Sequence, residues 1–269
     1  FRFVCPGDVE RFYAQKFPTI MKKAMVERLK KTYKISQFPE SGDEYPVRVT
    51  IMKNTVTVGL DTTGESLHKR GYRKYVSKAP ISETLAAALI MLTPWNKDRI
   101  LVDPFCGSGT FTIEAAQIAC NMAPGMNREF TAEKWTNIVQ KKSWYSSVEE
   151  ANDMIIKPTG MDIQGYDIDG DVIKAAMENA KLAEVDEYIH FQKRPVSKLS
   201  HRKKYGFIIS NPPYGERLEE KEELPKLYKE MGDAFNKLDS WSYFIITSFE
   251  DVEKFIGRKA NKNRKVYNG

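Results

Sequence analysis

The chain has 269 residues, of which 41% are hydrophobic and 29% are charged. This balance is typical of a soluble globular protein with one substantial core and room for a smaller second module. No apolar run reaches the ~18 residues that a membrane span needs, so we expect no membrane partner. The few cysteines indicate a reducing, cytoplasmic compartment. The 3 cysteines and 3 histidines are too scattered for a disulfide framework or a metal site. A net charge of +6 suits a polyanionic partner.

Residues 1–64 predict part of a small α+β module. The stretch TIMKKAMVERLKK (19–31) has its apolar residues at helical spacing and lysines on the other face. The stretch YPVRVTIMKNTVTVGLDTTG (45–64) alternates apolar and polar residues on both sides of a central KN, which is the pattern of a β-hairpin with one buried face. One helix and two strands are too few to build a domain alone.

Residues 65–80 form a basic segment that joins the two parts of the chain. Its stretch HKRGYRKY (68–75) interleaves basic residues with two tyrosines, and Ser82 is a plausible N-cap for the helix that follows. Two interpretations carry equal weight. The segment either contacts RNA or is a solvated linker.

From residue 81 onward, strand and helix patterns alternate. Such alternation predicts an α/β domain over 81–269 with a doubly wound, mostly parallel, Rossmann-like sheet. The segment 124–161 is too long for an ordinary connection, and its aromatic residues favour an inserted helix pair over a cover for a pocket. The expected strands are 99–103, 162–168, 188–194, 205–210 and 241–248, and the expected helices are 110–123, 171–183, 223–238 and 250–257.

The stretch VDPFCGSGTFTIEAA (102–116) follows the first of these strands with a glycine-containing turn that opens a helix. Glycines let the backbone approach a ligand closely, and a helix N-terminus offers free N–H groups, so the loop predicts a nucleotide-like ligand. An acidic residue entering the turn suits a ligand with an ammonium group, such as the methionine half of S-adenosylmethionine. Cys106 has no activating base nearby and is interpreted as a small packing residue. The loop residues assigned to the cofactor are Asp103, Phe105, Gly107, Ser108, Gly109 and Thr110.

The stretch GYDIDGD (165–171) ends the second strand with acidic residues. A carboxylate at this position accepts both ribose hydroxyls in doubly wound nucleotide sites, so Asp167 is the predicted ribose ligand. Ile168 is then expected to pack on the adenine. Asp169 also fits an N-cap of the next helix.

The stretch SNPPYG (210–215) ends the fourth strand with a stiff corner that is poor in donors and rich in acceptors. The side-chain oxygen of Asn211 and the carbonyl of Pro212 can accept both hydrogens of an exocyclic amine on a base. Tyr214 can stack on a base turned out of its helix. The alternative is a rigid turn that closes a strand, and the two cofactor-like strand ends before it favour the catalytic interpretation.

The motifs DPFCGSGT, GYDID and NPPYGERL, in this order, resemble those of class I S-adenosylmethionine-dependent methyltransferases that act on amino groups of nucleic-acid bases. More narrowly, LHKRGYR, APGMNREF and NPPYGERL resemble the bacterial THUMP-domain methyltransferases that make 2-methylguanosine in large-subunit rRNA. The resemblance covers about residues 17–269. It implies that 1–64 is the C-terminal part of a THUMP and ferredoxin-like RNA-binding module, and that Asn211, Pro212 and Tyr214 hold the target base.

The sequence departs from the family pattern in two places. The third strand is followed by KRPVSKL (193–199) where similar proteins often have an acidic residue near the adenine amine, so the backbone around Val196 is expected to hold the adenine. The last hairpin of the methyltransferase sheet is incomplete in this chain.

The leading interpretation is a guanine 2-amino methyltransferase that acts on large-subunit rRNA, with a ribosome assembly intermediate as an expected partner. A tRNA 2-methylguanosine enzyme and a DNA adenine-N6 methylase share the same amine-binding corner and remain alternatives. Outside this class, the alternatives are a non-catalytic RNA-binding scaffold and a protein-glutamine methyltransferase. The intact Asn-Pro-Pro-Tyr sequence argues against the scaffold, and the basic aromatic segment has no use in the glutamine enzyme.

Overall fold

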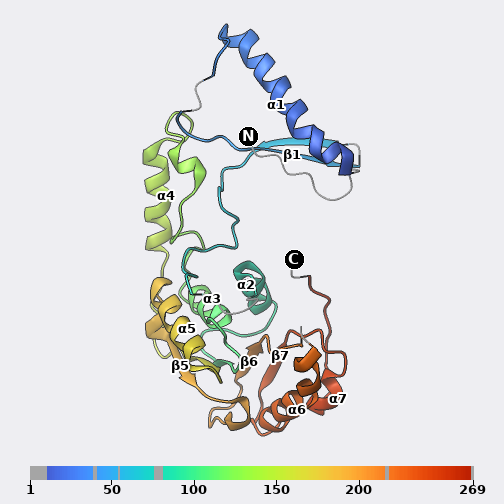
Figure 1. Cartoon of the computed structure of the whole chain (residues 1–269). Coiled ribbons are helices and arrows are strands. Elements are labelled where there is room, and N and C mark those ends of the chain that lie inside the picture. The colour runs from blue at the N-terminus through green and yellow to red at the C-terminus, as the bar shows by residue number, and fades with distance from the viewer. Residues whose placement is uncertain (1–10, 39–40, 54, 76–80, 216–217, 268–269) are drawn as a thin grey trace. The chain divides into compact units, whose positions relative to one another are not determined.

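The computed structural model describes residues 11–38, 41–53, 55–75, 81–215 and 218–267, and the chain forms two compact units (Figure 1). The first unit combines Phe1–Ser66 with Glu129–Ser147, and the second combines Leu67–Arg128 with Val148–Gly269. The sequence-based division kept the whole 124–161 insertion with the second unit, whereas the structure assigns its middle part to the first.

The first unit contains a helix and a two-stranded antiparallel sheet. Helix α1 (Arg11–Tyr33) is longer than expected and includes Pro18. Strands β1 (Val47–Met52) and β2 (Thr55–Leu60) form the predicted hairpin. The expectation of one buried face is wrong for β2, because every residue of that strand is exposed while Val47 and Val49 of β1 are buried.

The insertion returns to the first unit through its aromatic residues. Trp135 is buried next to the short 3-10 helix η1 (Thr131–Lys134), and its indole N–H donates to the Glu44 carbonyl at 2.7 Å. Its ring stacks on Tyr45 with 4.9 Å between ring centroids. The expected helix pair is wrong, because within 124–161 the structure has one α-helix, α4 (Lys141–Asp153), and otherwise only the short 3-10 helix η1.

The second unit is a five-stranded parallel sheet with helices on both faces, which confirms the predicted α/β, doubly wound class. The strand order is β5-β4-β3-β6-β7. The strands are β3 (Leu101–Asp103), β4 (Ile163–Asp167), β5 (Ile189–Lys193), β6 (Phe207–Ser210) and β7 (Ser242–Ile245). The helices are α2 (Glu83–Met91), α3 (Thr110–Ala119), α5 (Gly170–Leu182), α6 (Leu218–Phe235) and α7 (Val252–Ile256), with 3-10 turns η2 (Asp186–Tyr188) and η3 (Val196–Lys198).

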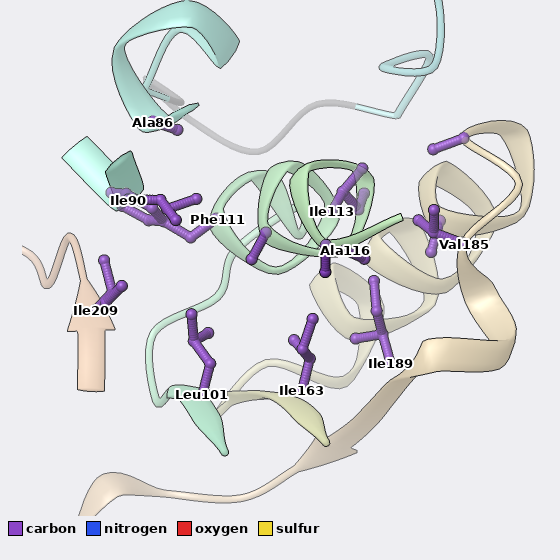
Figure 2. Packing of buried hydrophobic residues seen from close by; sticks show 14 of the residues in the cluster. Ala86, Ile90, Leu101, Phe111, Ile113, Ala116, Ile163, Val185, Ile189 and Ile209 are labelled. Atoms are coloured by element: carbon purple, nitrogen blue, oxygen red, sulfur yellow. The ribbon is translucent and has the colours of Figure 1, made fainter. Parts of the chain in front are cut away.

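Side chains alternate between the two faces of this sheet, as they must in strands covered on both sides. Figure 2 shows Leu101, Ile163 and Ile189 directed toward Ile113 and Ala116 of α3. The next residue along β3, Val102, belongs to the other buried cluster, which α6 and α7 cover. Helices α6 and α7 lie side by side on that face (Figure 1).

The chain changes direction between β3 and β6. From β3 the sheet grows outward through β4 and β5 on one side, and then resumes at β6 and β7 on the other side. Ligands of doubly wound sheets bind beyond the carboxyl ends of the strands at such a switch point. The fold therefore places the ends of β3, β4 and β6 where a ligand is expected.

No helix among the described residues is both long and apolar enough to cross a membrane. Within the same part of the chain, no group of three or more histidine, cysteine or acidic side chains is arranged to hold a metal ion.

Candidate active site

The predicted site residues come together at the carboxyl edge of the sheet. Asp103 is the last residue of β3 and lies opposite Gly165 of β4 in the parallel register. Asp167 ends β4, and Asn211 follows the last residue of β6. Since β3 lies between β4 and β6, the three motifs that sequence reasoning singled out share one edge.

Asp103 connects the loop after β3 to the end of β6. Its carboxylate Oδ1 accepts a hydrogen bond from the Ser210 hydroxyl at 2.5 Å and from the Phe105 N–H at 3.0 Å. Only 1% of Asp103 is exposed. Burial raises the pKa of this carboxyl to about 7, although the hydrogen bonds from Ser210 and Phe105 act in the opposite direction and lower it. Sequence reasoning missed Ser210, whose one signal was its position directly before Asn211.

The loop Pro104–Gly109, here called the cofactor loop, turns sharply into α3. Gly107 and Gly109 have φ values of 53° and 88°, which side chains other than glycine rarely adopt. The Gly109 N–H donates to the Cys106 carbonyl at 2.8 Å. Helix α3 begins at Thr110, so its first-turn N–H groups, which have no partner within the helix, lie next to this loop.

The polar side chains of the cofactor loop, Cys106 and Ser108, are both buried. The hydroxyl of Ser108 has no hydrogen-bond partner among the described residues. Burial raises the pKa of the Cys106 thiol well above its usual value, and the nearby charges of Asp103 and Asp167 raise it further. A thiol held in its neutral form is a poor nucleophile. Cys106 is therefore a packing residue, as the sequence indicated.

Asp167 is tied to the cofactor loop and to the start of α5. Its Oδ2 accepts from the Gly107 N–H at 3.2 Å, and its Oδ1 accepts from the Asp169 N–H at 3.0 Å. Burial raises the pKa of Asp167, while these backbone donors lower it. Asp169 accepts from the Asp171 N–H at 2.9 Å and is the N-cap of α5, which confirms its structural interpretation.

The two residues assigned to the adenine differ in exposure. Ile168 is 70% exposed, so its side chain is available to a planar ligand. Val196 is 6% exposed, and its side chain packs in the cluster under α6. A ligand next to Val196 therefore meets its backbone and not its side chain.

The Asn-Pro-Pro-Tyr corner holds a buried acceptor. The side-chain oxygen Oδ1 of Asn211 is buried and has no hydrogen-bond partner among the described residues. Pro212 is buried, whereas Pro213 is exposed and Tyr214 is half-buried. An unpaired buried acceptor costs about 1–3 kcal/mol, so a donor supplied by a substrate would recover this loss.

Tyr228, which sequence reasoning missed, supports the corner from α6. Its hydroxyl donates to the Pro213 carbonyl at 3.2 Å and lies 2.6 Å from the Thr247 hydroxyl. Tyr228 is fully buried, and burial raises its pKa. In the sequence this tyrosine looks like one more apolar position on the inner face of a helix.

The basic segment 65–80 suggests an RNA contact or a solvated linker, and the structure instead packs its central residues Arg70, Tyr72 and Arg73 within the second unit. Tyr72 is buried, and its hydroxyl donates to Glu114 Oε1 at 2.9 Å. The Nε atom of Arg70 lies 3.6 Å from the same oxygen. The side chains of Arg70 and Arg73 are only 10% and 12% exposed. These side chains are used within the second unit and are not available to RNA.

Comparison with known proteins identifies the domain that carries this site. Residues 70–269 match the sequence model of the RMKL-like methyltransferase domain. The chain belongs to this family. It is 45% identical over 252 residues to the putative RNA methyltransferase YpsC of Bacillus subtilis, covering 93% of this chain and 65% of YpsC. It is 38% identical over 237 residues to the ribosomal RNA large subunit methyltransferase K/L of Cellvibrio japonicus, covering 83% of this chain and 31% of that protein.

Solved structures share the fold over nearly the whole chain. A possible methylase from Clostridium difficile 630 superposes with a TM-score of 0.89 at 54% identity, over 93% of this chain and 66% of that one. The putative methyltransferase SMU.472, whose structure contains SAH, superposes with a TM-score of 0.89 at 40% identity, over 95% of this chain and 68% of that one. The chain thus spans about two thirds of these structures and less than a third of the K/L enzyme.

The residues present fit S-adenosylmethionine. The cofactor loop with its left-handed glycines offers backbone space and helix N–H groups for the methionine half. Asp167 ends the neighbouring strand with carboxylate oxygens suited to ribose hydroxyls. The buried, unpaired Ser108 hydroxyl and the exposed Ile168 side chain give the site one free polar group and one apolar surface.

Proposed function

We propose that this chain transfers a methyl group from S-adenosylmethionine to the exocyclic 2-amino group of a guanine in large-subunit rRNA. The observation that carries the proposal is the buried and unpaired Oδ1 of Asn211 at the end of β6. An acceptor kept from water without a partner is destabilising, and its position beside the cofactor loop gives it a catalytic use.

The cofactor is assigned to the residues at the ends of β3 and β4. Asp103, Phe105, Gly107, Ser108, Gly109 and Thr110 surround the methionine half, while Asp167, Ile168 and the backbone at Val196 take the ribose and adenine. S-adenosylmethionine supplies a methyl carbon that is electrophilic because it is bonded to a sulfonium. Asn211 adjoins both this cofactor and the base.

Asn211 and Pro212 act on the target amine. A planar exocyclic amine delocalises its lone pair into the ring and is a weak nucleophile. When Asn211 Oδ1 accepts one N–H and the Pro212 carbonyl accepts the other, the nitrogen becomes more tetrahedral and its lone pair points toward the electrophile. The N–C bond would form as the S–C bond breaks and S-adenosylhomocysteine leaves. The surplus proton on the nitrogen then passes to solvent, so no strong general base is needed, and the rate comes from positioning and electrostatics.

Tyr214 holds the base in place. A half-buried aromatic ring directly after the two prolines offers a stacking surface, and stacking of a base on an aromatic ring is worth ~1–3 kcal/mol. Because Asn211 Oδ1 is covered in the free chain, base entry must displace part of its cover. The base therefore has to leave its helix before it reaches the corner.

The choice of RNA rests on the relatives and on the first unit. YpsC is named as a putative RNA methyltransferase, and the K/L proteins are named as enzymes of the large ribosomal subunit. The first unit carries lysines along α1, and we assign it to the RNA-binding, THUMP-like module that the sequence suggests. An RNA partner also suits the net charge of +6.

Adenine is the second candidate base. A solved structure with 43% identity and a TM-score of 0.89 is described as a predicted N6-adenine-specific DNA methylase from Listeria monocytogenes. The 6-amino group of adenine presents the same two hydrogens to the corner as the 2-amino group of guanine.

In the deciding experiment, the purified chain is incubated with labelled S-adenosylmethionine and one of three substrates. These are rRNA and tRNA from cells that lack the gene, and unmethylated DNA. Mass spectrometry of the digested products identifies the modified nucleoside. We expect 2-methylguanosine in large-subunit rRNA. Labelled 6-methyladenine in DNA would overturn the guanine assignment, and 2-methylguanosine in tRNA alone would overturn the ribosomal one.

A further inference from the structure

The segment Leu67–Tyr75 follows a fixed path over the second unit. Gly71 has a φ of +96°, and a Cβ added there would lie 1.8 Å from the carbonyl oxygen of Asn127. Only glycine allows such an approach between two backbones. The backbone of the segment therefore packs at one fixed position on the unit, and this position determines where its side chains lie.

Arg73 links this segment to the start of α3. Its Nη2 atom donates to the Thr110 hydroxyl oxygen at 2.8 Å and to the Ile81 carbonyl at 2.7 Å. Its Nε atom lies 3.4 Å from Glu83 Oε1, and 3% of that glutamate side chain is exposed. A guanidinium is planar and its donors point in fixed directions. The ion pair with Glu83 thus sets the orientation in which Arg73 holds Thr110.

Asn179 of α5 links the segment to the cofactor loop. Its Oδ1 accepts from the backbone N–H groups of Lys74 and Tyr75, both at 3.2 Å. Its Nδ2 donates to the Tyr75 carbonyl at 2.8 Å and to the Ser108 carbonyl at 3.1 Å. An amide has two donors and two lone pairs, and all are used here. This side chain is 0% exposed.

We propose that Arg73 and Asn179 are positioning residues for methyl transfer. Arg73 acts through Thr110 and Asn179 acts through Ser108, and together they hold the cofactor loop in the shape that binds S-adenosylmethionine. The inference rests on the proposed use of this loop for the cofactor. Neither residue touches the reacting atoms. Both act on residues that flank Gly109, the point where the backbone turns into α3.

The geometry explains why the loop needs this support. Ser108 and Thr110 stand on either side of a residue with a φ of 88°, and the peptide groups around it direct the N–H donors at the helix start. Within the turn the Gly109 N–H donates to the Cys106 carbonyl at 2.8 Å, whereas the Ser108 carbonyl and the Thr110 hydroxyl bond to Asn179 and Arg73. Arg73, which belongs to the segment, fixes the Thr110 hydroxyl on one side of the turn. Asn179 of α5, which bonds to the segment, fixes the Ser108 carbonyl on the other side.

The test measures binding of S-adenosylhomocysteine to the full chain by titration calorimetry. Arg73→Lys keeps the positive charge beside Glu83 but loses the forked donor. We expect its Kd to rise about tenfold, which is the loss of roughly one oriented hydrogen bond. Asn179→Asp keeps the acceptor for the Lys74 and Tyr75 N–H groups but loses the donors to the Ser108 and Tyr75 carbonyls. A rise in Kd of at least the same size is expected.

Tyr72→Phe is the matched control. It removes a buried hydrogen bond of the same segment, but that bond ends on Glu114, one helical turn beyond Thr110. We expect Tyr72→Phe to lower the melting temperature and to leave the Kd unchanged. In methyl-transfer assays, Arg73→Lys should raise the KM for S-adenosylmethionine and leave kcat and the KM for RNA near the wild-type values.

A double-mutant cycle tests whether Arg73 acts through Thr110. If it does, Arg73→Lys adds no further loss of affinity to a Thr110→Val variant, whereas additive losses contradict the proposal. Equal weakening in Arg73→Lys and Tyr72→Phe, or wild-type affinity in Arg73→Lys and Asn179→Asp, would reduce the segment to a structural role. Failure of the wild-type chain to bind the ligand would instead refute the cofactor assignment itself.

Discussion

Replacing Asn211 with alanine is expected to separate activity from stability. In the proposed reaction, Asn211 Oδ1 accepts an amine hydrogen most strongly as charge develops on the nitrogen. Loss of one such oriented contact typically lowers kcat by about 10²–10³-fold. We therefore expect Asn211→Ala to lose turnover to this extent while its Kd for S-adenosylhomocysteine stays within about threefold of wild type.

The stability of the same variant follows from the state of the oxygen. Oδ1 is buried without a partner among the described residues, and such an acceptor costs about 1–3 kcal/mol. Its removal recovers this cost and loses some packing, so the free energy of unfolding should stay level or rise slightly. A catalytic side chain that destabilises the free protein is a known exchange of stability for function.

Three measurements check this prediction. Transfer of labelled methyl groups to rRNA gives kcat, calorimetry gives the cofactor Kd, and thermal unfolding gives stability. Asn236→Ala is a matched control, because its amide donates to the Ile256 carbonyl at 3.1 Å and joins α6 to α7 away from the site. The control should lose stability and keep turnover. The reasoning is refuted if Asn211→Ala keeps turnover within a few-fold of wild type, or if it loses both cofactor affinity and turnover equally.

Three further predictions concern the neighbouring residues. Asp167→Ala should weaken S-adenosylhomocysteine binding by about 10–100-fold, since hydrogen bonds to a charged acceptor are worth about 1.5–3 kcal/mol, and an unchanged Kd would remove Asp167 from the ribose. Tyr214→Ala should raise the KM for RNA through loss of ~1–3 kcal/mol of stacking while Tyr214→Phe behaves as wild type, and equal defects in both would point to the hydroxyl instead of the ring. Burial raises the pKa of Asp103 from 3.8 to about 7, so the folded state holds this proton more tightly and the resulting stability is lost as pH rises from about 4 to 7. The Asp103→Asn variant does not titrate, so the free energy of unfolding in urea should fall for wild type but not for the variant as the pH rises over this range. The variant's stability relative to wild type should rise by on the order of 4 kcal/mol, and a constant difference would contradict the buried carboxyl.

The sheet of the second unit was predictable because β3 (LVD) and β6 (FIIS) are short apolar runs, β4 (IQGYD) and β5 (IHFQK) alternate apolar with polar residues, and polar or glycine-containing turns follow the strands. The expected strand 99–103 corresponds to β3 (Leu101–Asp103), and 162–168 corresponds to β4 (Ile163–Asp167). The differences are at the ends, where pairing in a ladder and not residue type decides the boundary. The site motifs were visible for the same reason, since each one directly follows a strand.

The network around the site was not predictable, because its contacts join residues far apart in the chain. The bond between Asp103 and Ser210 spans 107 positions, and no local pattern connects the two. The stretch HKRGYRKY has the composition of a solvated or RNA-binding segment. Whether Arg73 faces solvent or Glu83 depends on the path of the backbone, which Gly71 sets through tertiary contact.

The bond between Asp103 and Ser210 connects the proposed cofactor site to the proposed base site. Asp103 begins the cofactor loop, and Ser210 is the residue directly before Asn211. Transfer between two bound partners requires their reacting atoms to be held within a few tenths of an ångström, since misplacement by about 1 Å can cost 10²-fold in rate. A buried contact of 2.5 Å between the two binding elements removes the freedom of one to shift against the other. The proposed cofactor and base sites therefore share a buried hydrogen bond at the ends of β3 and β6, which are neighbours at the switch point of the sheet.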